Sequence, residues 1–135
     1  MLNVVYRLAP FYTAVIAYLS LANNAAPAIA ITNIDKVYHA TAYFLMAVLW
    51  YLFFYARFLK SHAGFSFELS TILGNWERTI AIGAGVVSLI AGAFLELGQG
   101  YISANRSMDI LDMIANSCGI ILALVGLWFL SKKIR

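Results

Sequence analysis

The chain has 135 residues, of which 63% are hydrophobic and only 11% are charged, and its formal net charge is +3. A soluble domain carries about 25% charged residues, so the composition excludes an ordinary soluble fold and indicates an integral membrane protein. The positive charge does not indicate a nucleic-acid partner, because the basic residues stand at the ends of apolar runs, where membrane anchors belong.

Four apolar segments follow one another along the chain, each near the roughly 20 residues that span the hydrocarbon of a bilayer. We expect helices over about 7–27, 37–59, 79–98 and 108–130, within a single membrane domain covering residues 1–135. Helices are favoured because lipid offers the backbone no hydrogen-bond partner, and four strands of this length would leave open edges. The predicted fold is an all-α bundle of four transmembrane helices.

The first segment is the weakest of the four and admits a second interpretation. One early arginine, an apolar stretch and small residues ending in Ala-Ile-Ala also resemble a cleavable signal peptide, whose removal would leave three helices. The broad, tyrosine-rich apolar stretch favours a retained helix.

The Lys and Arg residues set the predicted orientation. With the N-terminus inside, seven lie at cytoplasmic ends of the segments and two, Lys36 and Arg106, lie outside. The seven are Arg7, Arg57, Lys60, Arg78, Lys132, Lys133 and Arg135. This bias predicts that both termini are cytoplasmic. The connection over residues 60–77 then lies inside, and its aromatic and aliphatic residues predict a short helix along the headgroups.

Polar residues gather at the predicted outer ends of the last three helices. Asp35 and His39 are four residues apart, so they share one helix face. Glu96 and Gln99 end the third helix, and the fourth begins with Asp109, Asp112 and Asn116 on one face. Three helices therefore present polar groups at one membrane depth, which predicts a polar site near the extracytoplasmic face.

Each polar residue taken singly also has a structural explanation. Asp35 can cap the second helix in a Thr-Asn-Ile-Asp sequence, and Asp109 can face the dipole of the fourth helix. We predict that Arg106 folds back and bridges Glu96 to Asp109 or Asp112, since its planar fork can engage two carboxylates. Ionisable groups inside the membrane boundary are nevertheless costly unless paired, which favours a functional role for the group as a whole.

These motifs resemble those of the VanZ-like family of small bacterial membrane proteins. The resemblance lies in DKVYHATAY, then ELGQ, then RSMDILDMIANSCG, and it runs from about Asp35 to Gly126. The matching positions are Asp35, Lys36, His39, Glu96, Gln99, Arg106, Asp109, Asp112, Asn116 and Gly119. The resemblance implies a multi-pass protein of the bacterial cytoplasmic membrane, with a role in the cell envelope and in resistance to the glycopeptide antibiotic teicoplanin.

Three kinds of chemistry remain open for the predicted site. As a binding site, it would hold an envelope lipid headgroup, a glycan precursor, a glycopeptide-related ligand or a cation. The binding residues would be Asp35, Lys36, His39, Glu96, Gln99, Arg106, Asp109, Asp112 and Asn116. Its acidic balance repels a bare phosphate, so a divalent cation is a candidate cofactor, with His39, Glu96, Asp109 and Asp112 as candidate ligands. As an enzyme, it would use Glu96, His39 and Asp112 for acid–base catalysis on an envelope lipid. The third alternative is a purely structural network of ion pairs.

Overall fold

The computed structural model describes residues 2–22, 34–61, 68–102 and 109–134, and these form five helices. Four are long: α1 (Leu2–Leu21), α2 (Ile34–Ser61), α4 (Arg78–Ile102) and α5 (Ile110–Ile134). Each of the four is long and apolar enough to cross a membrane, which confirms the prediction of four candidate transmembrane helices. The fifth, α3 (Leu69–Gly74), is a single short helix in the predicted inner connection.

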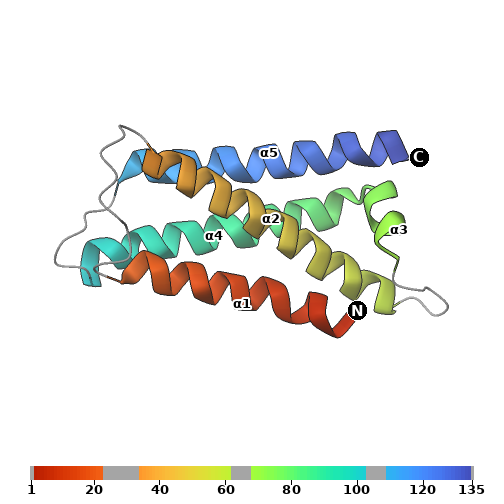
Figure 1. Cartoon of the computed structure of the whole chain (residues 1–135), viewed down its shortest axis with the longest axis horizontal. Coiled ribbons are helices and arrows are strands. Elements are labelled where there is room, and N and C mark those ends of the chain that lie inside the picture. Colours follow the sequence, from red (N-terminus) through yellow and green to blue (C-terminus); the bar gives the residue numbers. More distant parts are fainter. Residues whose placement is uncertain (1, 23–33, 62–67, 103–108, 135) are drawn as a thin grey trace.

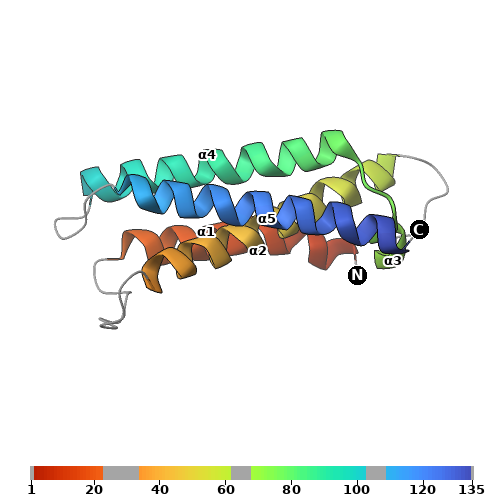
Figure 2. The same ribbon diagram turned by 90° about the horizontal axis from the view of Figure 1, so that it is seen from above.

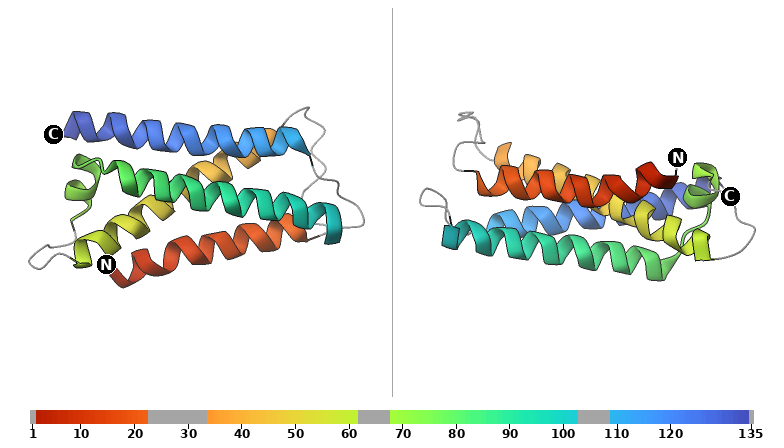
Figure 3. Two further views of the ribbon diagram at one scale, coloured as in Figure 1. Left: turned by 180° about the vertical axis from the view of Figure 1, so that it is seen from behind. Right: turned by 90° about the horizontal axis from the view of Figure 1, so that it is seen from below.

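The long helices lie alongside one another, with α2 crossing the others diagonally (Figure 1). α2 and the glycine-rich α4 each contact the three other long helices, and the most extensive packing is between α2 and α5. α4 and α5 run side by side in the view from above (Figure 2), and the first and last described residues lie at the same end of the bundle (Figure 3).

The helix bounds differ from the predicted ones mainly at the polar ends. α2 begins at Ile34 rather than 37, so Asp35 and Lys36 lie within its first turn. α4 continues to Ile102, past the predicted end at 98. A carboxylate in the first turn and a lysine in the last turn of α2 and α5 match the helix dipole, which helps to explain where these helices start and end.

The interior is built from two clusters along α2. One, towards the chain termini, includes Tyr51, Tyr55, Leu59 and Ile72, and the other includes Tyr43, Met46, Ala47 and Ile120. Many large apolar side chains point outwards instead; Phe94, for example, is 70% exposed. Outward-facing apolar side chains suit a protein whose surroundings are lipid.

Close backbone contact draws α5 against α2 next to the polar end. A Cβ atom on Gly119 would lie 2.0 Å from the carbonyl oxygen of Ala40, so only glycine permits this approach. On the facing side of α2, a Cβ on Gly92 of α4 would lie 2.9 Å from the Tyr43 ring. These small residues set how close α2 lies to α4 and α5 one turn below the predicted site.

Candidate functional site

Lys36, in the first turn of α2, connects α2 to the start of α5. Its ammonium group lies 3.0 Å from the Asp35 carboxylate and donates to Asp109 Oδ2 at 2.7 Å. It also donates to Asp112 Oδ1. One cation therefore neutralises part of the charge of three carboxylates, one in α2, one in α5 and one immediately before α5, so its own hydrogen-bonding capacity is used within the protein.

Asp109 lies immediately before α5 and has two structural contacts. Its Oδ1 accepts a hydrogen bond from the backbone N–H of Leu111 at 2.8 Å, as an N-terminal helix cap does. Its Oδ2 accepts from Lys36, and this charged hydrogen bond, followed by the bond from Leu111, lowers the pKa of the Asp109 carboxyl below its ordinary value. Asp109 thus stays ionised and helps to fix the start of α5.

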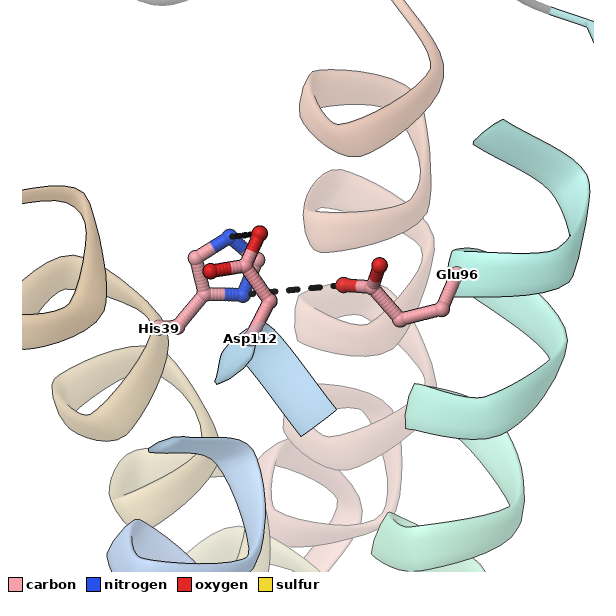
Figure 4. Close-up of side chains that lie close together, drawn as sticks. All are labelled: His39, Glu96 and Asp112. Carbon is pink, nitrogen blue, oxygen red and sulfur yellow. Dashed lines mark ion pairs between the residues drawn. The ribbon is translucent and has the colours of Figure 1, made fainter. Parts of the chain in front are cut away.

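His39 lies one turn further along α2, between carboxylates of two other helices (Figure 4). Its Nε2 is 3.4 Å from Asp112 Oδ2, and its Nδ1 is 3.9 Å from Glu96 Oε1. Glu96 reaches towards the ring from α4 and is only 2% exposed. The imidazole and the two carboxylates therefore form one compact group across α2, α4 and α5.

Asn116, one turn below Asp112 on α5, orients the His39 ring. Its Oδ1 lies 3.0 Å from His39 Nδ1. Because an amide oxygen can only accept, Nδ1 carries the proton of this hydrogen bond, which leaves the lone pair of a neutral ring on Nε2. Asn116 is thus placed to select the tautomer of His39.

Two polar atoms at this site are buried without a hydrogen-bond partner among the described residues, Glu96 Oε2 and Asn116 Nδ2. A buried polar atom without a partner costs about 1–3 kcal/mol, so each calls for an explanation. Asn116 borders a cavity of about 40 Å³ between α4 and α5, which exceeds the roughly 10–15 Å³ that a water molecule needs. Glu96 Oε2 has no such explanation.

Gln99, one turn after Glu96 on α4, connects α4 to α1. Its Nε2 donates to both the carbonyl oxygen of Ser20, at 3.1 Å, and the Ser20 hydroxyl, at 2.5 Å. Gln99 is almost fully buried, so these bonds satisfy an amide that would otherwise be costly in the interior. Ser20 was missing from the predicted site, because a lone serine near the end of an apolar helix carries no sequence signal.

The structure brings most of the predicted site residues to one end of the bundle. The contacts above link Asp35, Lys36 and His39 of α2 with Asp109, with Asp112 and Asn116 of α5, and with Glu96 of α4. Gln99 of α4 faces α1 instead. Arg106 lies outside the described residues, so its predicted bridge to Glu96 stays a prediction. The two aspartates that it was expected to pair with are already in contact with Lys36.

Three of these side chains lie close enough together to hold a metal ion. His39, Glu96 and Asp112 each offer one ligand atom, and these atoms all lie within 4.8 Å of one another. Asp109, the fourth candidate ligand from the sequence, is not part of this group; its carboxylate contacts Lys36 and the α5 backbone.

Comparison with known proteins adds no assignment. No protein-family model matches the chain, and no curated protein and no solved structure matches it either. The resemblance to the VanZ-like family therefore rests on the motif positions in the sequence and stays a prediction, while the geometry of the site has to be interpreted from its own residues.

Proposed function

We propose that this chain is a multi-pass protein of the cell envelope that binds a divalent metal cation through His39, Glu96 and Asp112. One observation carries the proposal. Glu96 is 2% exposed, its Oε2 has no partner among the described residues, and its carboxylate lies in a group whose ligand atoms are all within 4.8 Å. A bound cation would satisfy this carboxylate and offset the cost of burying it.

Charge favours a cation over the direct binding of a phosphate. Four carboxylates, those of Asp35, Glu96, Asp109 and Asp112, stand at this end of the described chain against the one ammonium of Lys36. Lys36 is itself occupied by three of them, so it is not available to an anionic headgroup. The surplus of negative charge attracts a divalent ion.

The donor set suits a transition ion such as Zn²⁺. One imidazole with two carboxylates is a mixed nitrogen and oxygen set, which fits Zn²⁺ better than it fits Ca²⁺ or Mg²⁺. The hydrogen bond from Nδ1 of His39 to Asn116 is the outer contact that metal-binding histidines usually make, with Nε2 left for the metal. Ligand atoms around a tetrahedral Zn²⁺ lie about 3.4 Å apart, whereas those of the three residues lie up to 4.8 Å apart. Glu96 approaches His39 from the Nδ1 side, so binding at Nε2 requires the acidic side chains, above all that of Glu96, to close in by up to about 1.4 Å.

A cation held by three side chains keeps room for a further ligand. A phosphate-bearing envelope lipid or glycan precursor would therefore bind to the cation, so its phosphate would not have to contact the carboxylates directly. A role in glycopeptide resistance, which the VanZ-like resemblance implies, would follow from such binding. Catalysis by the same residues is the alternative, favoured by the buried carboxylate of Glu96 beside His39.

The experiment measures metal binding to the purified protein in detergent. After removal of metal by a chelator, Zn²⁺ is titrated by calorimetry, and the bound metal is counted by mass spectrometry. We expect about one Zn²⁺ per chain, a higher melting temperature with Zn²⁺, and loss of both in Glu96→Gln. Asn116→Ala should weaken binding by about 10–100-fold, as outer contacts of metal ligands do.

Asp35→Asn is the matched control, because it removes a carboxylate at the same end whose side chain is 60% exposed and whose ion pair among the described residues is with Lys36. It should bind Zn²⁺ like the unmodified protein. If the unmodified protein binds no Zn²⁺, Mn²⁺ or Ca²⁺ and its melting temperature is unchanged by all three, the proposal is wrong and the polar group is a structural network.

A further inference from the structure

A hollow of about 510 Å³ lies at the opposite end of the bundle from His39, where α1 and α2 meet. It is lined by Tyr6, Phe53, Arg57, Lys60 and Ser61, and we call it the Arg57 hollow. Arg57 lies 18 residues after His39 on the same helix, which places it about 27 Å away along the helix axis. The Arg57 hollow is thus separate from the proposed metal site.

The two cations of the Arg57 hollow have no acidic partner among the described residues. Arg57 and Lys60 are three residues apart on α2, so they project from one face, and both are exposed. All six Asp and Glu residues of the sequence are described, and every ion pair among the described residues involves Lys36 or His39. No Asp or Glu side chain pairs with Arg57 or Lys60, so the hollow suits an anion.

The aromatic wall of the hollow is fixed in place. The Tyr6 hydroxyl of α1 donates to the carbonyl oxygen of Ala56 at 3.0 Å, which attaches the ring to α2. The Tyr6 ring also packs edge-on against Phe53, with 5.7 Å between centroids, and Lys60 Nζ lies 5.8 Å from its centre. Ring and cation are therefore held side by side before any ligand arrives, which lowers the entropic cost of binding.

The depth of the Arg57 hollow in the membrane indicates which kind of anion it can bind. The hollow lies near the end of α2 and the beginning of α1, two helices long enough to span the bilayer, so it lies at the level of the lipid headgroups. Aromatic rings mark this level in membrane proteins, and basic pockets between transmembrane helices bind acidic headgroups. Phe53 offers an apolar surface beside the charges, which a lipid uses and an inorganic ion does not.

We propose that the Arg57 hollow binds the phosphate of an anionic phospholipid in the leaflet at the chain termini. The guanidinium fork of Arg57 takes two phosphate oxygens, and the ammonium of Lys60 adds a point charge beside them. Tyr6 and Phe53 contact the glycerol and the first part of the acyl chains. The positive-inside rule predicts that this leaflet is the cytoplasmic one, which carries anionic lipids.

The test compares lipids of different charge on the purified protein in detergent. Phosphatidylglycerol, phosphatidylcholine and inorganic phosphate are added separately, and binding is followed by native mass spectrometry and by the melting temperature. We expect phosphatidylglycerol to bind and stabilise the protein more than phosphatidylcholine does, and added salt to reduce the difference. Inorganic phosphate at the same concentration should not stabilise it. Equal effects of the two lipids, or an equal effect of inorganic phosphate, would overturn the proposal.

Two double variants locate the binding. Arg57→Gln with Lys60→Gln should weaken phosphatidylglycerol binding by about thirtyfold, the value for two charges at a membrane surface. Lys132→Gln with Lys133→Gln removes the same charge from the last turn of α5, outside the hollow, and should keep most of the binding. Arg57→Lys keeps the charge without the planar guanidinium group, so its affinity for phosphatidylglycerol should lie between that of the unmodified protein and that of the Arg57→Gln and Lys60→Gln double variant. If both double variants lose binding equally, the lipid recognises general positive charge and the hollow is not its site.

Discussion

Replacing Lys36 by methionine tests whether the polar end holds α2 and α5 together. Methionine keeps most of the length and apolar surface of the lysine stem but removes the charge. Loss of the Lys36 ammonium group would leave the carboxylates of Asp109 and Asp112 facing each other across the start of α5, with no cation of the described chain between them. The variant should therefore be less stable than the unmodified protein.

The size of the effect follows from how exposed the three side chains are. Removing one partner of a buried ion pair costs about 3–5 kcal/mol, whereas an exposed pair contributes about 0–1 kcal/mol. The side chains of Lys36, Asp112 and Asp109 are 21%, 13% and 41% exposed, so the energetic contribution of these ion pairs should lie between that of a buried pair and that of an exposed pair. We expect a loss of about 2 kcal/mol in the free energy of unfolding.

The assay is unfolding in mixed detergent, followed by helical circular dichroism. Lys133→Met is the control, since it removes the same charge from an exposed position in the last turn of α5. It should change the free energy of unfolding by less than about 0.5 kcal/mol. Adding Asp109→Asn to Lys36→Met should recover part of the loss, because one unpaired carboxylate is gone. If Lys36→Met unfolds like Lys133→Met, the reasoning that α2 and α5 are held by this ion pair is refuted.

Four further outcomes can be measured in the same way. Gly119→Ala should destabilise by about 1–3 kcal/mol or abolish folding, because its Cβ would overlap the α2 backbone, whereas Gly126→Ala, with no atom within 4 Å of the added Cβ, should be neutral. Asp109 has a lowered pKa in the folded state, so its contribution to stability is complete above the ordinary Asp pKa of about 4 and disappears as the pH falls through the lowered value. Thermal unfolding measured between pH 7 and pH 3 should show this loss of stability, and Asp109→Asn should not show it. Gln99→Leu removes two hydrogen bonds between α4 and α1 and should cost about 1–2 kcal/mol of unfolding free energy, and a variant as stable as the parent would show that these bonds contribute nothing. A cysteine introduced at Ser103, in a chain without its native cysteine, should react with an impermeant reagent added outside intact spheroplasts, and labelling from the cytoplasmic side alone would reverse the predicted orientation.

The sequence was sufficient for an all-helical fold with four helices long enough to span a bilayer, and for the gathering of polar residues at one end of it. Four apolar segments long enough to span a bilayer can form only helices, because lipid cannot satisfy the backbone, and the structure has four such helices. The membrane also limits the depth of each polar residue. Since three helices carry acids or amides at the same end, their convergence could be expected without knowing how the helices pack.

The partner of each polar side chain was decided only by the tertiary structure. Counting charges gave Lys36 and Arg106 as the two cations near the acids, but it could not give the rotation of each helix about its own axis. That rotation is fixed by packing, above all where Gly119 of α5 meets the backbone of Ala40. It turns Lys36 towards Asp109 and Asp112, and it places His39 against Glu96, while Gln99 meets Ser20 of α1.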